Sequence, residues 1–160
     1  MSNGIKVKKR DGRIESLDLE KMHVMVQEAC EGLAGVSASQ VEMQSGIQFY
    51  DGITTDEIQE ILIKSASDLI DLETPNYQFV AARLLLFALR KSLYGKMREL
   101  PHLEAHIMSC TNIEVYDKDI FIQYSREEIE KANSFIDHDR DFLFTYAGLR
   151  QVVDKDLVQD

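Results

Sequence analysis

Residues 5–21 read IKVKKRDGRIESLDLEK, and their pattern predicts how the N-terminal part of the chain folds. Apolar and polar residues alternate on both sides of Asp11-Gly12, a pair that is typical of a tight hairpin turn. The stretch therefore predicts two short antiparallel strands. Asp18 follows the second strand, and its carboxylate is suited to cap a helix. The buried face of that helix is expected from residues at helical spacing: Met22, Val26, Ala29 and Leu33.

Three further helices are expected before residue 95. Ser37 and Gln40 have the spacing of a capping box, and so do Thr54 and Glu57. Pro75 is suited to the first turn of the last of these helices. The second helix is expected to point Val41, Ile47 and Phe49 inward, and the third to bury Ile58, Ile61, Leu62, Ser65 and Leu69.

The segment from Tyr77 to Tyr94 is almost wholly apolar and predicts the central helix of a bundle, which Gly95 ends. Beyond it, a short helix is expected over Leu103 to Cys110. The capping box at Ser125-Arg126-Glu127-Glu128 predicts another through about His138. The last ten residues, from Gln151, contain no helix stop or cap. The predicted fold is mainly α, with a β-hairpin and a four-helix bundle in residues 1–95 and a smaller helical segment in residues 96–160.

Composition excludes several classes of protein. The 160 residues include 28 acids and 18 bases, so the net charge of −10 opposes general binding of nucleic acid. The longest apolar run, Leu84 to Leu89, is too short to span a bilayer. Cys30 and Cys110 lie far apart and form no CxxC pair, which disfavours a zinc ribbon or a disulfide scaffold. With no signal peptide at the start, we expect a cytoplasmic protein without membrane partners.

The first 21 residues hold six bases and are the one clearly basic region of this acidic sequence. Lys9, Arg10 and Lys21 can converge there beside a helix start, and such a cluster is suited to a polyphosphate. Glu15 and Asp18 could accept hydrogen bonds from an adenine amino group or a ribose hydroxyl, or hold a magnesium ion. The competing interpretation is a solvated hairpin whose lysines protect its edge from aggregation.

Two other patterns are weaker. His102, His106 and Cys110 recur every four residues, so one helix face could bind a metal ion, although a polar, partly exposed face is the favoured interpretation. Asp137-His138-Asp139 could form a carboxylate–histidine site, but a charged helix end is favoured. The sequence contains no GxSxG, Walker A or GxGxxG pattern, which argues against classical hydrolase, P-loop and Rossmann functions.

Four motifs in order resemble the large subunit of class I ribonucleotide reductase of bacterial or phage type, which begins with an ATP-cone domain. The similarity continues through residues 135–141 and 144–146 and so covers essentially the whole chain. The four motifs are V-x-K-R-D-G-x-x-E-x-x-D-x-x-K in residues 7–21, Y-D-G-I-x-T in 50–55, P-x-Y-Q-x-x-A-A-R in 75–83 and L-R-K-x-x-Y-G in 89–95.

The resemblance implies an allosteric activity site at which ATP keeps the reductase active and dATP inhibits it. Magnesium is expected to accompany the nucleotide. Glu15 matches the position that reads adenine, and Thr55 matches another nucleotide contact. The full set of nucleotide-binding residues that the resemblance implies is Lys9, Arg10, Glu15, Asp18, Lys21, Thr55 and Lys91.

This chain departs from the family pattern at three positions. Asp18 stands where many relatives have Asn, which adds a negative charge. Gln59 and Ala88 stand where close bacterial relatives have His, which removes possible phosphate contacts. These differences bear on dATP inhibition and on a second nucleotide in the cone more than on ATP binding itself.

The resemblance also implies what lies elsewhere. The family carries its redox cysteines, radical cysteine and radical-transfer tyrosines on an α/β barrel further along, so no catalytic residue is expected in this chain. The implied partners are the rest of the large subunit and the small radical-bearing subunit. Two alternatives are a free-standing cone regulator of the zinc-ribbon repressor type, which needs a cysteine-rich ribbon, and a partner-docking module with a degenerate nucleotide site.

Overall fold

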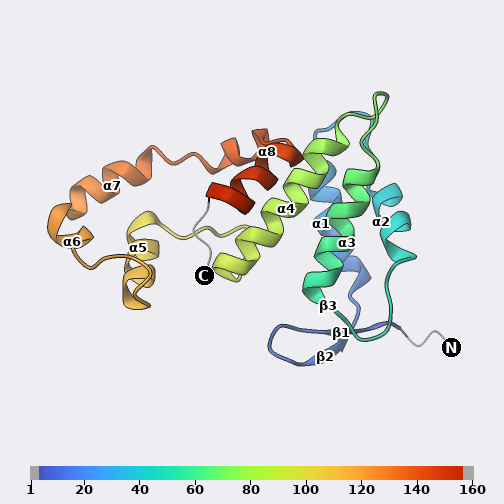
Figure 1. Ribbon diagram of the computed structural model, residues 1–160, viewed down its shortest axis with the longest axis horizontal. Helices are drawn as coiled ribbons and strands as arrows, with labels where there is room; N and C mark the ends of the chain where they lie inside the picture. The colour runs from blue at the N-terminus through green and yellow to red at the C-terminus, as the bar shows by residue number, and fades with distance from the viewer. Residues whose placement is uncertain (1–3, 157–160) are drawn as a thin grey trace. The chain divides into compact units, whose positions relative to one another are not determined.

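The computed structural model describes residues 4–156, which are mainly helical (Figure 1). The chain divides into two compact units. The first contains the residues up to Leu89 together with those from Phe142 onward, and the second contains Arg90–Asp141. Among the described residues, no helix combines the length and the apolar character needed to cross a membrane.

The first unit opens with the expected hairpin, formed by β1 (Lys6–Lys8) and β2 (Ile14–Ser16). A third strand, β3 (Ile53–Thr54), pairs parallel to β1, so the small sheet has the order β2-β1-β3. This strand was not predicted, because two residues are too few to show an alternating pattern. Val7 of β1 and Ile53 of β3 are partners in the register, and both are buried.

Four helices follow as the sequence predicts: α1 (Leu19–Cys30), α2 (Ala38–Gly46), α3 (Thr55–Asp68) and α4 (Tyr77–Tyr94). The predicted core of α2 is partly wrong. Val41 is fully buried, but Ile47 is 83% exposed because the helix ends at Gly46 and Ile47 lies on its C-terminal cap. On α3, Ile58, Leu62 and Ser65 are buried as expected.

Helix α4 is the central helix, and polar groups near its start fasten it to the other helices. Tyr77 is buried, and its hydroxyl accepts from the Ser37 N–H at 3.0 Å while donating to Gln40 at 2.7 Å. Arg83 Nη1 donates to the carbonyl oxygens of Ala29 and Glu31 at 3.3 and 2.7 Å, at the C-terminal end of α1. Tyr77 and Arg83 of the P-x-Y-Q-x-x-A-A-R motif thus serve helix packing and helix capping.

The chain returns to the first unit after residue 141. There it forms α8 (Tyr146–Gln151), which continues into a π-helix, η2 (Val152–Asp156). The sequence predicts neither. The Thr145 hydroxyl caps α8 by accepting from the Gly148 N–H at 3.2 Å, and Leu149 is buried.

The second unit contains α5 (Leu103–Asn112), α6 (Ile120–Gln123) and α7 (Arg126–Ser134), and η1 (His138–Leu143), a 3₁₀ helix, begins in it. The capping box at Ser125 and Glu128 is present as predicted. The prediction that this helix runs to about His138 is wrong. Arg90 Nη2 donates to the His138 carbonyl at 3.2 Å and to Asp141 at 2.7 Å, and these contacts fix a separate 3₁₀ turn.

Candidate nucleotide site

The hairpin places three charged side chains on one face. Val7 and Glu15 are directly opposed in the register, Lys8 and Ile14 form the next pair, and the Lys9 N–H donates to the Arg13 carbonyl at 2.8 Å, so Lys9 and Arg13 form the second pair toward the turn. Opposed residues of an antiparallel pair project to the same side. Lys9, Arg13 and Glu15 therefore share the face of the sheet that carries Val7, which is buried.

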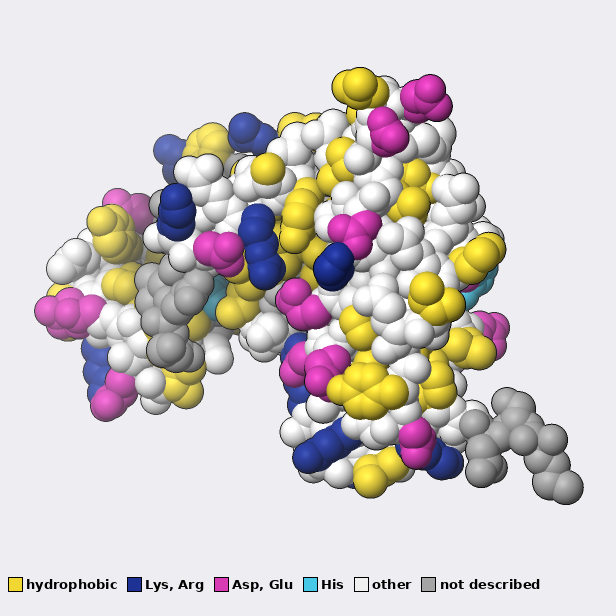
Figure 2. Space-filling model, turned by 45° about the vertical axis from the view of Figure 1, so that its right-hand side comes forward, with side chains coloured by type: hydrophobic (Ala, Val, Ile, Leu, Met, Phe, Trp, Pro, Cys, Tyr) yellow, Lys and Arg dark blue, Asp and Glu magenta, His cyan; other side chains and the backbone are white. Residues whose placement is uncertain are grey.

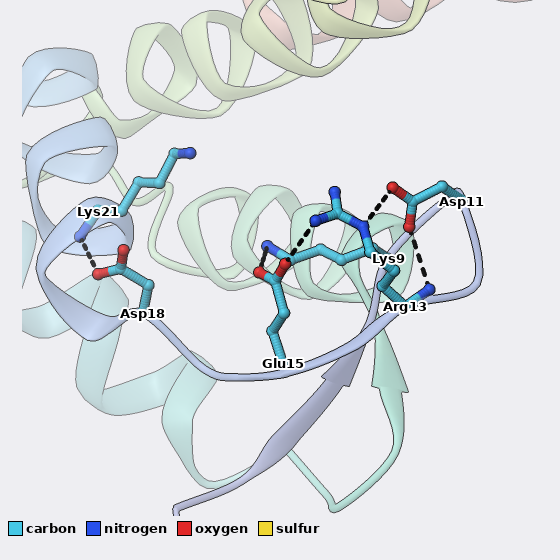
Figure 3. A network of polar contacts seen from close by, with 6 residues as sticks. All are labelled: Lys9, Asp11, Arg13, Glu15, Asp18 and Lys21. Carbon is cyan, nitrogen blue, oxygen red and sulfur yellow. Dashed lines mark hydrogen bonds and ion pairs between the residues drawn. The ribbon is translucent and has the colours of Figure 1, made fainter.

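The Glu15 carboxylate joins both cations of this face. Figure 3 shows Glu15 between Lys9 and Arg13, with distances of 3.4 Å to the Lys9 ammonium and 3.2 Å to Arg13 Nη1. Arg13 Nε also contacts Asp11 at 2.7 Å. The backbone N–H and the side chain of Arg13 both donate to Asp11 and lower the pKa of that carboxyl, and Asp11 in turn raises the pKa of Arg13.

The turn itself needs a glycine. The Gly12 N–H donates to the Lys9 carbonyl at 2.9 Å, and Gly12 adopts a φ of 85°, a left-handed conformation that side chains rarely permit. The Asp-Gly pair of the sequence is thus explained by the left-handed conformation that the turn requires at Gly12. The turn leaves Arg10 at the tip of the hairpin, where it contacts α3.

Arg10 links the hairpin to the start of α3. Its Nε and Nη2 donate to the same oxygen of Asp56, at 2.9 and 2.7 Å. Thr55 is the first residue of α3, beside this contact, and Thr54 caps the helix in a capping box with Glu57. The start of α3 and the tip of the hairpin therefore form one polar surface.

The Y-D-G-I-x-T motif builds this junction. The Tyr50 hydroxyl donates to Glu57 at 2.8 Å, and Asp51 accepts from the Lys6 N–H at 2.8 Å. Gly52 has a φ of 87°, and its N–H donates to the Lys6 carbonyl at 2.8 Å. The motif thereby turns the chain into β3 and brings Thr55 next to the hairpin.

The start of α1 supplies the other predicted residues. Asp18 is the N-cap, and its carboxylate accepts from the backbone N–H of Lys21 at 2.9 Å, as the sequence predicts for the cap. In Figure 3 the side chain of Lys21 extends from α1 toward the side on which Lys9 and Glu15 lie. The helix start adds backbone N–H groups with partial positive charge to the same region.

Lys91 belongs to a different unit from these residues. It is half-buried in the last turn of α4, within the second unit, whereas the other predicted nucleotide contacts belong to the first unit. Gln59 and Ala88, the two positions of departure on α3 and α4, are buried and half-buried respectively.

The cations of this region are held by weak, exposed contacts. The side chains of Lys9, Arg10 and Arg13 are 30%, 42% and 70% exposed, and each is paired with a carboxylate. Figure 2 shows basic and acidic side chains interleaved around the hairpin at the lower edge of the view. Exposed ion pairs contribute about 0–1 kcal/mol. A triphosphate, which forms several charge-assisted hydrogen bonds at once, can therefore replace such carboxylates.

The structure adds Arg13 and Asp56 to this region, and no pattern in the sequence had singled out either residue. Arg13 was counted among the bases, but its role depends on the hairpin register, which pairs it with Lys9. A count along the Asp-Gly turn could have found that pairing. Asp56 contacts Arg10 across 46 residues, and no local pattern signals such a pair.

Neither weaker candidate forms a metal site in the part of the chain that the structure describes, where no group of three or more potential ligands is gathered. His102 contacts Glu130 at 3.0 Å. His106 lies 3.6 Å from the Cys110 sulfur and stacks edge-on against Tyr94. Asp141, which follows Asp137-His138-Asp139, binds Arg90, so that segment serves to anchor the 3₁₀ turn.

Comparison with known proteins identifies the region that contains this site. Residues 5–92 match the family model of the ATP cone domain. The whole chain is 46% identical to ribonucleoside-diphosphate reductase 1 subunit alpha of Escherichia coli and 48% identical to the alpha subunit of Buchnera aphidicola from Acyrthosiphon pisum. It is 42% identical to the alpha subunit of Enterobacteria phage T4 over 98% of its length.

The chain spans about a fifth of the length of these relatives, 21%, 21% and 20% respectively. The hairpin and the four helices that the turn, cap and apolar patterns predict for the first 95 residues are all present. The resemblance drawn from the four motifs is confirmed: the chain belongs to the ATP-cone domain family and corresponds to the N-terminal region of ribonucleotide reductase alpha subunits.

Proposed function

We propose that this chain binds ATP or dATP as an allosteric effector, through the face of the hairpin and the starts of α1 and α3. The observations that carry the proposal are the Lys9–Glu15 contact and the Arg10–Asp56 contact beside Thr55, the first residue of α3, inside the segment that matches the ATP cone. A net charge of −10 would otherwise repel a triphosphate, so a local group of cations has a clear use.

Each residue has a role that follows from its chemistry. Lys9, Arg10 and Lys21 contact phosphates, while Glu15 accepts a hydrogen bond from the adenine amino group. Lys9 contacts Glu15 at 3.4 Å, so ATP binding requires the phosphates to replace the Glu15 carboxylate as the partner of Lys9. The Glu15 carboxylate can then accept a hydrogen bond from the base. Asp18 and Thr55 contact the nucleotide at the two helix starts, and Lys91 supplies a further phosphate contact.

Magnesium accompanies the triphosphate in this proposal. The ion prefers oxygen ligands and keeps several waters, so phosphates and one carboxylate are enough to hold it. Asp18 is the carboxylate best suited by its place at the start of α1, although one of its oxygens already accepts from Lys21. The proposed role of the protein residues is therefore to bind the magnesium–nucleotide complex and not a separate metal ion.

The bound nucleotide serves regulation of a larger protein. We propose that the chain is the regulatory N-terminal part of a cytoplasmic ribonucleoside-diphosphate reductase large subunit, and that the reduction of ribonucleotides takes place in the rest of that subunit with the small radical-bearing subunit. The support is the alignment of the full chain with alpha subunits whose names state that activity.

Isothermal titration calorimetry with ATP, dATP and GTP tests the nucleotide site. Lys9→Ala and Lys21→Ala are each expected to weaken ATP binding by about 1.5–3 kcal/mol, the usual range for a hydrogen bond to a charged group. Raising the salt concentration should weaken binding to the wild-type chain as well. Lys118→Ala changes an exposed residue of the second unit and is the control. A folded wild-type chain that binds no adenine nucleotide at millimolar concentration would refute the proposal and favour the docking-module alternative.

A further inference from the structure

The part of the chain that returns to the first unit contains a set of contacts that the family match does not include. The ATP cone match ends at residue 92, yet the compact unit that contains the hairpin also contains the chain from Phe142 onward. We define residues 142–151 as the returning segment. It includes the last part of η1 and all of α8 (Figure 1).

Phe142 attaches this segment to α4. Its ring packs edge-on against Phe87, with 6.3 Å between the ring centroids. The Arg83 guanidinium lies over the same ring, 5.4 Å from its centroid. An arginine over an aromatic face is attracted by the ring quadrupole, and the attraction grows as the pair is shielded from water. Leu149, seven residues later, is 4% exposed and adds a buried apolar contact to the unit.

Arg83 connects Phe142 with the far end of α1. Its Nη1 donates to the Ala29 and Glu31 carbonyls, which lie at the C-terminal end of that helix. Burial lowers the pKa of Arg83, and its Nε is buried without a hydrogen-bond partner among the described residues. The guanidinium is therefore held between two elements, and a shift of α1 changes its position over the Phe142 ring.

Two helices that begin at the proposed nucleotide site are linked to the returning segment. Helix α1 is capped by Asp18, and carbonyls at its C-terminal end accept from Arg83 of α4, the residue that lies over the Phe142 ring. Helix α3 has Asp56, the partner of Arg10, in its first turn. One turn later Glu60 lies 3.9 Å from Arg150 of α8. A helix moves as a rigid element, so a displacement at its first turn is felt along its length.

From these contacts we propose that the returning segment is the output element of the cone. Nucleotide binding at the starts of α1 and α3 strengthens the attachment of Phe142 and α8, and the chain that continues from α8 receives the signal. The proposal rests on the proposed function, because it needs a nucleotide at the hairpin. It assigns a regulatory role to residues 142–151, which lie outside the segment that matches the cone.

Amide hydrogen exchange of the full chain, with and without ATP, tests the proposal, together with calorimetry on the same samples. In the wild-type chain ATP should slow exchange of the α8 amides by about fivefold or more, the lower end of ordinary allosteric coupling. Phe142→Leu keeps an apolar side chain but removes the aromatic face under Arg83. It should abolish this response and leave protection of the hairpin by ATP in place.

A matched control is Phe135→Leu, since Phe135 is 76% exposed and lies in the second unit. It should respond to ATP as the wild-type chain does. Should Phe142→Leu fail to fold, as judged by circular dichroism, Arg150→Gln removes the contact with Glu60 and is expected to reduce the response of α8. Because coupling between two sites is reciprocal, the ATP affinity of either variant should fall by no more than the factor by which the ATP-induced slowing of α8 exchange is reduced.

The outcomes separate the two proposals. If ATP binds and protects the hairpin but leaves exchange of α8 unchanged, the output role is wrong and the nucleotide site stands. Equal loss of the response in Phe135→Leu and Phe142→Leu would also overturn the output role. If calorimetry shows no ATP binding by the folded wild-type chain, the nucleotide proposal fails, and the output role fails with it.

Discussion

Arg10 donates through both Nε and Nη2 to a single carboxylate oxygen of Asp56, at 2.9 and 2.7 Å. The contact joins the tip of the hairpin to the first turn of α3, two elements that are 46 residues apart. Lys9 and Glu15 form a second contact of the same kind within the hairpin. The cations proposed to bind phosphate thus already lie against carboxylates, and a nucleotide must compete with these internal partners.

Asp56→Asn should strengthen ATP binding. The substitution removes the negative partner of Arg10 and one charge that repels the triphosphate, while an amide can still lie against the guanidinium. The pair is exposed, so the free energy of unfolding should change by no more than about 1 kcal/mol. Calorimetry measures the affinity. Asp68→Asn, which breaks the exposed Lys64–Asp68 pair near the other end of α3, is the control. Weaker ATP binding by Asp56→Asn would show that Arg10 does not contact the phosphates.

Glu15→Ala should erode the preference for adenine over guanine. A carboxylate accepts from the adenine amino group but would face the carbonyl oxygen of guanine. The quantity to measure is the ratio of the dissociation constants for GTP and ATP, which should move toward one. Asp11→Ala removes another acid that contacts Arg13 and is the matched control. An unchanged ratio in Glu15→Ala would assign base recognition to a different residue.

Acid should loosen the start of α3 through Glu57. The Thr54 N–H and hydroxyl and the Tyr50 hydroxyl donate to Glu57 and hold its pKa below the ordinary value of 4.5. A carboxyl whose pKa is lowered by folding contributes stability above its unfolded pKa. That contribution is lost as the pH falls through the folded value. The melting temperature should therefore fall below about pH 4.5, and less steeply in Glu57→Gln.

Glu73→Gln, at an exposed acid in the loop before α4, is the control for this comparison. The informative quantity is the difference in slope between each variant and the wild-type chain. Identical slopes for wild type and Glu57→Gln would mean that the capping box does not respond to pH.

Leu149→Ala tests whether α8 is part of the first unit. Leu149 is 4% exposed, and truncating a buried leucine usually costs about 2–5 kcal/mol of unfolding free energy. Leu143→Ala, at a residue that is 74% exposed, should change stability by no more than about 0.5 kcal/mol. Chemical denaturation followed by circular dichroism provides both values. Equal and small losses would show that α8 packs only loosely.

Local signals in the sequence predicted much of this fold. The Asp-Gly turn, the cap at Asp18 and the capping boxes at Thr54 and Ser125 are all present. Each of these depends on residues within a few positions of one another, so its energetics are contained in a short window. The apolar stretch from Tyr77 to Tyr94 is likewise the central helix.

The features that the sequence did not predict depend on distant contacts. β3 exists because Ile53 pairs with Val7, and the 3₁₀ turn at His138 is held by Arg90, 48 residues away. Neither has a periodic pattern of its own. In the candidate site, Lys9 and Glu15 could be named from the sequence and its resemblance to the family. The ion pair between Arg10 and Asp56 depends on tertiary structure and could not.

The most direct test of the nucleotide site is a titration of ATP into the isotopically labelled chain, followed by amide chemical shifts. Saturable shifts are expected at the hairpin and at the starts of α1 and α3, including the amides of Lys9, Lys21 and Thr55, with the amide of Lys118 unchanged. Shifts confined to other parts of the chain, or no saturable shift at millimolar ATP, would contradict the proposed nucleotide site.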